Sequence, residues 1–127
     1  MSAPNRLLLW TPVFLYVALI FWLSSAPRYI PGAEKFPWID KPLHAIEYFP
    51  LGLLTFRAIG RSWSSRSFGR IFLWGFLFTL AVGVSDEFYQ RFTPMRTSSM
   101  LDSAADLAGA SLGQLAGWAL LFRRVRG

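Results

Sequence analysis

Acidic residues and the one histidine of this chain gather in three short segments that could do chemistry. The first segment, DKPLHAIEY over residues 40–48, places Lys41, His44 and Tyr48 on one face of a helix. An amine, an imidazole and a phenol on one face can hold an anionic group and transfer a proton to or from it. Lys41 and Tyr48 are therefore candidate substrate-binding residues, and His44 is a candidate catalytic acid.

The second segment, SDEFYQRF over residues 85–92, brings two carboxylates next to each other. Asp86 and Gln90 are four residues apart and would share a helix face, whereas Glu87 points about 100° away. Either carboxylate is a candidate general base, and Gln90 would bind and orient the substrate. Ser85 is a candidate nucleophile only through its position beside Asp86.

The third segment, PMRTSSMLDSAAD over residues 94–106, contributes Arg96 and two aspartates. The guanidinium of Arg96 suits an anionic head group, so Arg96 and Asp102 are predicted to bind substrate. Asp102 and Asp106 share a stripe on a helix with three small residues: Gly109, Gly113 and Gly117. Because such stripes let membrane helices approach closely, we expect both aspartates to face the interior of a bundle.

The composition of the chain indicates which kind of fold positions these residues. The chain has 127 residues, of which 54% are hydrophobic and 16% are charged, and it has no cysteine. This excludes disulfides, thiol nucleophiles and cysteine-based metal centres, and it argues against a solvated globular protein. We predict a single all-α domain over residues 1–127, an integral membrane four-helix bundle with helices near 7–25, 42–59, 70–90 and 103–122. The first stretch also resembles a signal peptide, but its apolar run is longer than that of most signals.

The arginines predict the orientation of this bundle. Eight arginines with no acid among them precede the first span, separate the second from the third and follow the fourth. The positive-inside rule therefore places both termini in the cytoplasm and a polar site at the outer face. Most tryptophans would lie near the inner interface: Trp10, Trp63, Trp74 and Trp118. The net charge of +6 follows from this pattern, and without an RNA or DNA module signature nucleic acid is not an expected partner.

Taken together, the three segments resemble the VanZ-like membrane family. Residues 40–52 follow D-K-x-x-H-x-x-x-Y-x-x-L-G, residues 86–90 follow D-E-x-x-Q, and residues 94–113 follow P-x-R, then Asp and two glycines. The resemblance runs over residues 10–117 and implies a small multi-pass protein of the bacterial cytoplasmic membrane. The founding member of the family is linked with teicoplanin resistance. Asp106 departs from the pattern, because the family more often has Asn there.

Several functions remain open from the sequence. A membrane-embedded hydrolase or transferase would use His44, Asp86 and Glu87 on a membrane lipid or lipid-linked envelope intermediate. A non-catalytic binder of a lipid or lipoglycopeptide would use the same side chains, and an oligomeric transporter is a weaker alternative. In a purely structural interpretation, ion pairs hold the helices together. One histidine with several carboxylates would also suit Mg²⁺ or Mn²⁺, although the sequence assigns no metal ligand, cofactor or oligomeric state.

Overall fold

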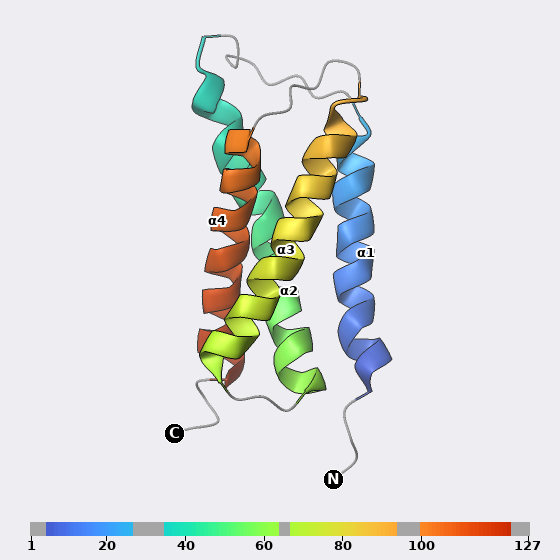
Figure 1. The fold of residues 1–127 in the computed structure, drawn as a ribbon, viewed down its shortest axis with the longest axis vertical. Coiled ribbons are helices and arrows are strands. Elements are labelled where there is room, and N and C mark those ends of the chain that lie inside the picture. The colour runs from blue at the N-terminus through green and yellow to red at the C-terminus, as the bar shows by residue number, and fades with distance from the viewer. Residues whose placement is uncertain (1–4, 27–34, 64–66, 94–99, 123–127) are drawn as a thin grey trace.

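Helices make up the whole of the regular structure in the computed structural model, which describes residues 5–26, 35–63, 67–93 and 100–122 (Figure 1). The α-helices are α1 (Arg6–Ser24), α2 (Lys41–Ser62), α3 (Phe68–Gln90) and α4 (Met100–Gly117). A 3-10 turn, Pro37–Asp40, leads into α2, and a π-helical turn, Trp118–Phe122, follows α4. No strand occurs in these ranges, so the prediction of an all-α fold is confirmed.

Successive helices run in opposite directions, which gives the molecule two chemically different ends (Figure 1). At the upper end in this view, α1 and α3 finish and α2 and α4 begin; at the lower end, the reverse holds. The three predicted chemical segments belong to the beginnings of α2 and α4 and to the end of α3. The topology therefore brings segments far apart in the sequence to the upper end.

Helices α2 and α4 pack most closely because glycines remove side chains from their interface. A Cβ atom added at Gly52 in α2 would overlap the main-chain carbonyl of Ala110 in α4. A Cβ atom added at Gly109 or Gly113 in α4 would likewise overlap a main-chain carbonyl of α2. The predicted glycine stripe is thus buried against α2, and the same face of α4 carries the buried Asp102 and Asp106.

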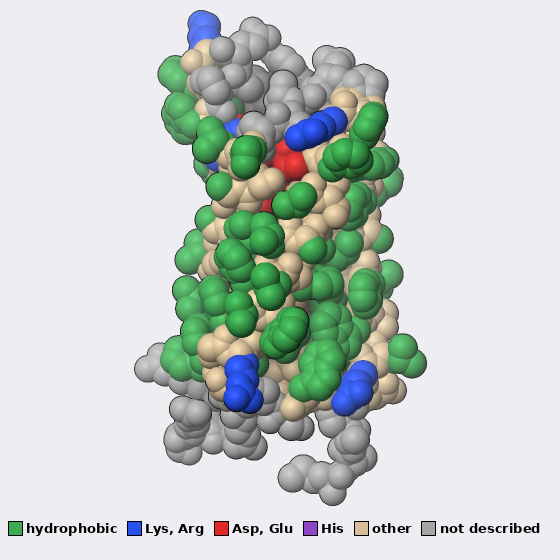
Figure 2. All heavy atoms as spheres, viewed as in Figure 1, with side chains coloured by type: hydrophobic (Ala, Val, Ile, Leu, Met, Phe, Trp, Pro, Cys, Tyr) green, Lys and Arg blue, Asp and Glu red, His purple; other side chains and the backbone are tan. Residues whose placement is uncertain are grey.

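Apolar side chains form both the interior and much of the surface. The buried core draws on all four helices and includes Leu9, Val13, Ile20, Tyr48, Leu51, Ala58, Val82 and Ala110. Hydrophobic side chains also cover the middle of the face in Figure 2, whereas Lys and Arg lie near its two ends. Within the described ranges, α1 and α3 are long and apolar enough to cross a membrane. Ionisable residues along α2 and α4 make those two helices less apolar.

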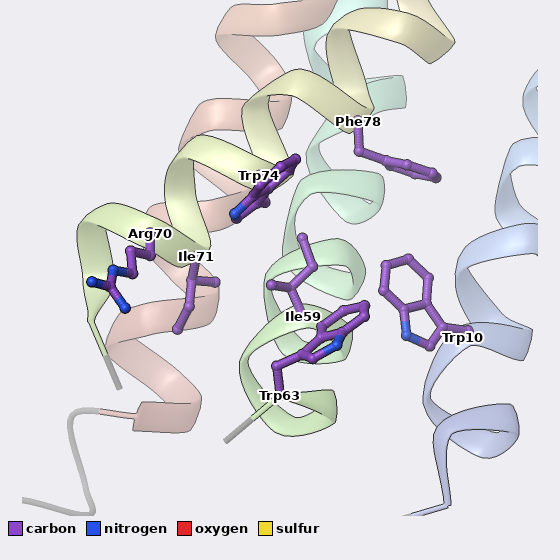
Figure 3. A pocket seen from close by; sticks show the side chains of 7 residues that line it. All are labelled: Trp10, Ile59, Trp63, Arg70, Ile71, Trp74 and Phe78. Carbon is purple, nitrogen blue, oxygen red and sulfur yellow. The ribbon is translucent and has the colours of Figure 1, made fainter. Parts of the chain in front are cut away.

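Aromatic and basic side chains meet at the lower end of the molecule. A pocket of about 620 Å³ lies there, and Figure 3 shows the side chains that line it: Trp10, Ile59, Trp63, Arg70, Ile71, Trp74 and Phe78. Arg6 lies over the ring of Trp63, with Cζ 5.7 Å from its centroid. The indole Nε1 of Trp10 donates a hydrogen bond to Ser62 Oγ at 3.0 Å. Three of the four tryptophans predicted for one interface therefore lie together beside arginines.

Candidate functional site

All four helices send polar side chains into the upper end of the bundle. We call this set the polar cluster, and its members are Ser24 from α1, Lys41, His44 and Tyr48 from α2, Asp86, Glu87 and Gln90 from α3, and Asp102 and Asp106 from α4. All of them are buried except Lys41, whose side chain is 26% exposed. In Figure 2, acidic side chains are visible near the upper end, with basic side chains to either side.

The cluster contains the predicted catalytic and substrate-binding residues that the structure describes, apart from the candidate nucleophile Ser85. These residues are Lys41, His44, Tyr48, Asp86, Glu87, Gln90 and Asp102. Arg96, the remaining predicted binding residue, lies outside the described residues. The helical spacing explains this outcome, because it places the polar members of each segment on the inward face of its helix.

One part of the cluster is a hydrogen-bonded group around the carboxylate of Asp86. The hydroxyl of Ser24 donates to Oδ1 of Asp86, and the hydroxyl of Tyr48 donates to Oδ2 at 3.0 Å. The amide of Gln90 donates to Ser24 Oγ at 3.1 Å and reaches Asp86 Oδ2 at 3.4 Å. Asp86 therefore joins α1, α2 and α3, and it is in direct contact with a hydroxyl from which it could accept a proton.

A second part of the cluster is centred on the imidazole of His44. Its Nδ1 lies 2.8 Å from Oδ1 of Asp106, which fixes the orientation of the ring. Its Nε2 faces two further carboxylates, at 3.8 Å from Asp102 Oδ1 and 4.0 Å from Asp40 Oδ2. The ammonium of Lys41 pairs with Asp102 and lies 3.3 Å from Asp40 Oδ1. This part of the cluster can therefore hold an anionic group through Lys41 or a cation through its carboxylates.

Two overlapping sets of side chains in this part of the cluster have the donor atoms of a metal site. Asp40, His44 and Asp102 form one set, and His44, Glu87 and Asp106 form the other. Within each set the donor atoms lie within 4.8 Å of one another. The first set is at the rim, because Asp40 is 20% exposed, whereas every member of the second set is buried.

The prediction of Ser85 as the hydroxyl group beside Asp86 was wrong. Ser85 is exposed, so the candidate nucleophile next to Asp86 in sequence points away from the cluster. A step of one residue turns a side chain by about 100° around a helix, which separates Ser85 from the buried face. Ser24, which was not predicted as a site residue, is fully buried and bonded to Asp86 instead. The sequence feature that could have identified Ser24 is its position at the polar end of the first apolar stretch.

Two carboxylates also belong to the site although no functional role was predicted for them. Asp106 was expected only to face the bundle interior, and it is the hydrogen-bond partner of His44. Asp40 appeared in the sequence only as the first residue of the motif at residues 40–52, and it lies one helical turn from His44 at the rim of the cluster. The sequence feature that could have identified both carboxylates is a four-residue spacing, which links Asp40 to His44 and Asp106 to Asp102.

Comparison of the chain with protein-family models, curated proteins and solved structures finds no match. The function must therefore be argued from the polar cluster and from the surface of the molecule.

Proposed function

We propose that this chain is a VanZ-like integral membrane protein of the bacterial cytoplasmic membrane, and that its polar cluster acts on the head group of an amphiphilic, lipid-linked envelope substrate. In this proposal four helices cross the membrane, both termini are cytoplasmic, and the polar cluster opens toward the outer face. The reaction class is a hydrolysis or group transfer that needs proton transfer at the head group.

The observation that carries the proposal is the convergence of ionisable and polar side chains from four helices at one end of a bundle whose other buried side chains, among the described residues, are uncharged. A buried ionisable group in a membrane helix costs about 2.5–3.5 kcal/mol on insertion scales, so such groups occur where they pair or function. Here a hydroxyl, a phenol, an amide, an imidazole and several carboxylates meet at the same depth. Ion pairs alone would need neither the Ser24–Asp86 contact nor the imidazole.

The surface of the molecule supports the proposed placement in a membrane. Large apolar side chains are strongly exposed along the helices, for example Leu7 at 78%, Leu15 at 66% and Trp74 at 63%. Exposed apolar surface of this extent is typical of contact with lipid or another protein. Arginines and tryptophans occur together at the lower end, which is the arrangement expected at a cytoplasmic interface.

The contacts suggest a role for each part of the polar cluster. Lys41 is the most exposed member and would meet an anionic head group first. His44, oriented by Asp106, presents Nε2 toward the rim, where the protonated imidazole can donate a hydrogen bond or a proton to the head group when no metal ion is bound to that nitrogen. Asp86 would act as the general base toward the Ser24 hydroxyl or toward a water molecule bound in its place.

Antibiotic susceptibility tests the link to the envelope. We would express the wild-type chain and Asp86→Asn in a sensitive bacterium at matched membrane levels and measure the inhibitory concentrations of teicoplanin and vancomycin. Thr11→Ala is the control, because Thr11 is an exposed residue in the lower half of α1, away from the polar cluster. We expect protection by the wild type and the control and loss of protection in Asp86→Asn. Absence of protection by the wild type would contradict the resistance role.

A non-catalytic binder would use the same residues, and a conservative substitution separates it from an enzyme. Asp86→Glu keeps the negative charge but moves the carboxylate relative to the hydroxyls of Ser24 and Tyr48 by one methylene. Proton transfer depends on tighter geometry than charge-based binding does. If the protein is an enzyme, Asp86→Glu should therefore lose most of the protection given by the wild type, whereas a binder should retain it.

A further inference from the structure

The rim of the polar cluster contains three donor atoms directed at one another from two helices. His44 and Asp40 are four residues apart, on α2 and on the turn that leads into it, and Asp102 lies in the first turn of α4. Nε2 of His44 is 3.8 Å from Asp102 Oδ1 and 4.0 Å from Asp40 Oδ2. These separations are longer than hydrogen bonds and lie within the range of an ion pair.

The imidazole of His44 has one nitrogen in use and one directed at the rim. The side chain is only 3% exposed, and Nδ1 is held by Asp106 at 2.8 Å. Nε2 makes no hydrogen bond to any side chain or main-chain group that the structure describes. A buried imidazole nitrogen without a proton has a lone pair that can bind a divalent cation, and the two neighbouring carboxylates can bind the same ion.

We propose that Asp40, His44 and Asp102 bind a divalent cation of the Mn²⁺ or Mg²⁺ type, with Nε2 and one oxygen from each carboxylate as ligands. Two atoms that each lie about 2.1 Å from one ion are at most about 4.2 Å apart. The two distances from Nε2, 3.8 and 4.0 Å, fall within this limit, and the donor atoms of the set all lie within 4.8 Å of one another. The partly exposed Asp40 can move to close the site. The mixture of imidazole and carboxylate favours Mn²⁺ over Mg²⁺.

The contact between Asp106 and His44 supports this choice of ligand atoms. Histidines that bind metals usually donate the other ring N–H to a carboxylate, which fixes the tautomer and the ring orientation. Asp106 is in that position, with Oδ1 2.8 Å from Nδ1. The alternative set of His44, Glu87 and Asp106 would require Nδ1 to exchange this hydrogen bond for a metal bond inside a closed site.

Lys41 is the internal competitor of the proposed cation. Its ammonium contacts Asp102 and lies 3.3 Å from Asp40 Oδ1, so it neutralises the same two carboxylates. An incoming cation must share these oxygens with Lys41 or displace it. Removing the ammonium should therefore tighten cation binding, which a purely structural ion pair would not predict.

The test uses the full-length chain in detergent micelles, cleared of metal with EDTA and titrated with Mn²⁺ alone. The loss of the free Mn²⁺ signal in electron paramagnetic resonance measures binding. We expect saturable binding of one ion per chain, and about a 10-fold or greater loss of affinity in Asp40→Asn and Asp102→Asn. Asp106→Asn should lose about 10-fold through the ring orientation. Lys41→Met should bind more tightly, and Thr11→Ala, at an exposed position in the lower half of α1, should match the wild type.

Circular dichroism and gel filtration identify the variants that fold, and only those are compared. Asp40→Asn keeps the test decisive if Asp102→Asn does not fold, because Asp40 is partly exposed and precedes α2. Failure of the folded wild type to bind Mn²⁺ saturably would overturn the proposal. A larger loss in Glu87→Gln than in Asp40→Asn would overturn the ligand assignment in favour of the inner set. Neither result depends on whether the protein turns over a substrate.

Discussion

The imidazole of His44 and the carboxylate of Asp106 form a buried couple between α2 and α4, with Nδ1 and Oδ1 2.8 Å apart. The two helices that hold this couple are also the pair whose main chains touch at glycines. The close approach of α2 and α4 therefore has a functional consequence, because it brings a short aspartate within reach of the histidine across the interface.

Replacement of Asp106 tests whether this couple is a hydrogen bond or mainly a charge interaction. Asp106→Asn keeps the volume and can still pair with Nδ1, whereas Asp106→Ala leaves a buried imidazole nitrogen without a partner. We expect Asp106→Ala to lower the free energy of unfolding by about 1–3 kcal/mol, and Asp106→Asn to lower it by clearly less. Denaturation in mixed detergent micelles measures the free energy of unfolding of both variants. Equal losses in Asp106→Ala and Asp106→Asn would show that the negative charge of Asp106, and not its hydrogen bond, stabilises the couple.

Glycine replacement tests the helix contact itself. The added Cβ of Gly113→Ala would overlap a main-chain carbonyl of α2, so the helices must separate. We expect a loss of about 1–3 kcal/mol or failure to fold, because overpacking cannot be relieved by a side-chain rotation here. Gly69→Ala is the control, since no atom lies within 4 Å of its added Cβ. Similar stability of the two variants would contradict the observed packing.

The phenol of Tyr48 provides a test of the group around Asp86. Tyr48→Phe removes only the hydroxyl that donates to Asp86 Oδ2 at 3.0 Å, in a side chain that is fully buried. We expect it to lower the free energy of unfolding by about 1–3 kcal/mol. Tyr89→Phe should have little effect, because Tyr89 is 42% exposed and keeps its ring contact with Phe21. If the free energy of unfolding of Tyr48→Phe equals that of the wild type, the hydrogen bond from Tyr48 to Asp86 does not stabilise the fold.

Cysteine labelling tests the proposed orientation, and the absence of native cysteine makes single-cysteine variants simple to interpret. Lys35→Cys lies on the chain before α2, and Ser67→Cys lies directly before α3; both positions are exposed. A membrane-impermeant maleimide should label Lys35→Cys in intact spheroplasts and Ser67→Cys only after permeabilisation. The reverse pattern would place the polar cluster on the cytoplasmic side.

The features that depend on a single helix were predictable from the sequence. The four-residue spacing of Asp86 and Gln90, and of Asp102 and Asp106, places each pair on one face, and all four side chains are buried. The length of the apolar stretches also predicted an all-α fold, which the described residues confirm. Local geometry is sufficient for these predictions, because side-chain direction repeats along a helix whatever its neighbours are.

The pairings between helices were not predictable in the same way. The contact of Ser24 with Asp86 depends on the position of α1 along α3, and no spacing within one helix reports that position. The pairing of His44 with Asp106 likewise depends on the register between α2 and α4. This register follows from the glycine contacts, whose main-chain partners on the facing helix can be identified only once the helices are packed.

Envelope lipid analysis tests the central claim that the polar cluster acts on a lipid-linked substrate. We would delete the gene in its host, complement the strain with wild type, Asp86→Asn or the control Thr11→Ala at matched membrane levels, and compare lipid extracts by mass spectrometry. The account predicts that an amphiphile with an anionic head group accumulates in the deletion strain and in Asp86→Asn, and returns to its normal level with the wild type and the control. Identical lipid profiles in all strains, or full restoration by Asp86→Asn, would contradict the account.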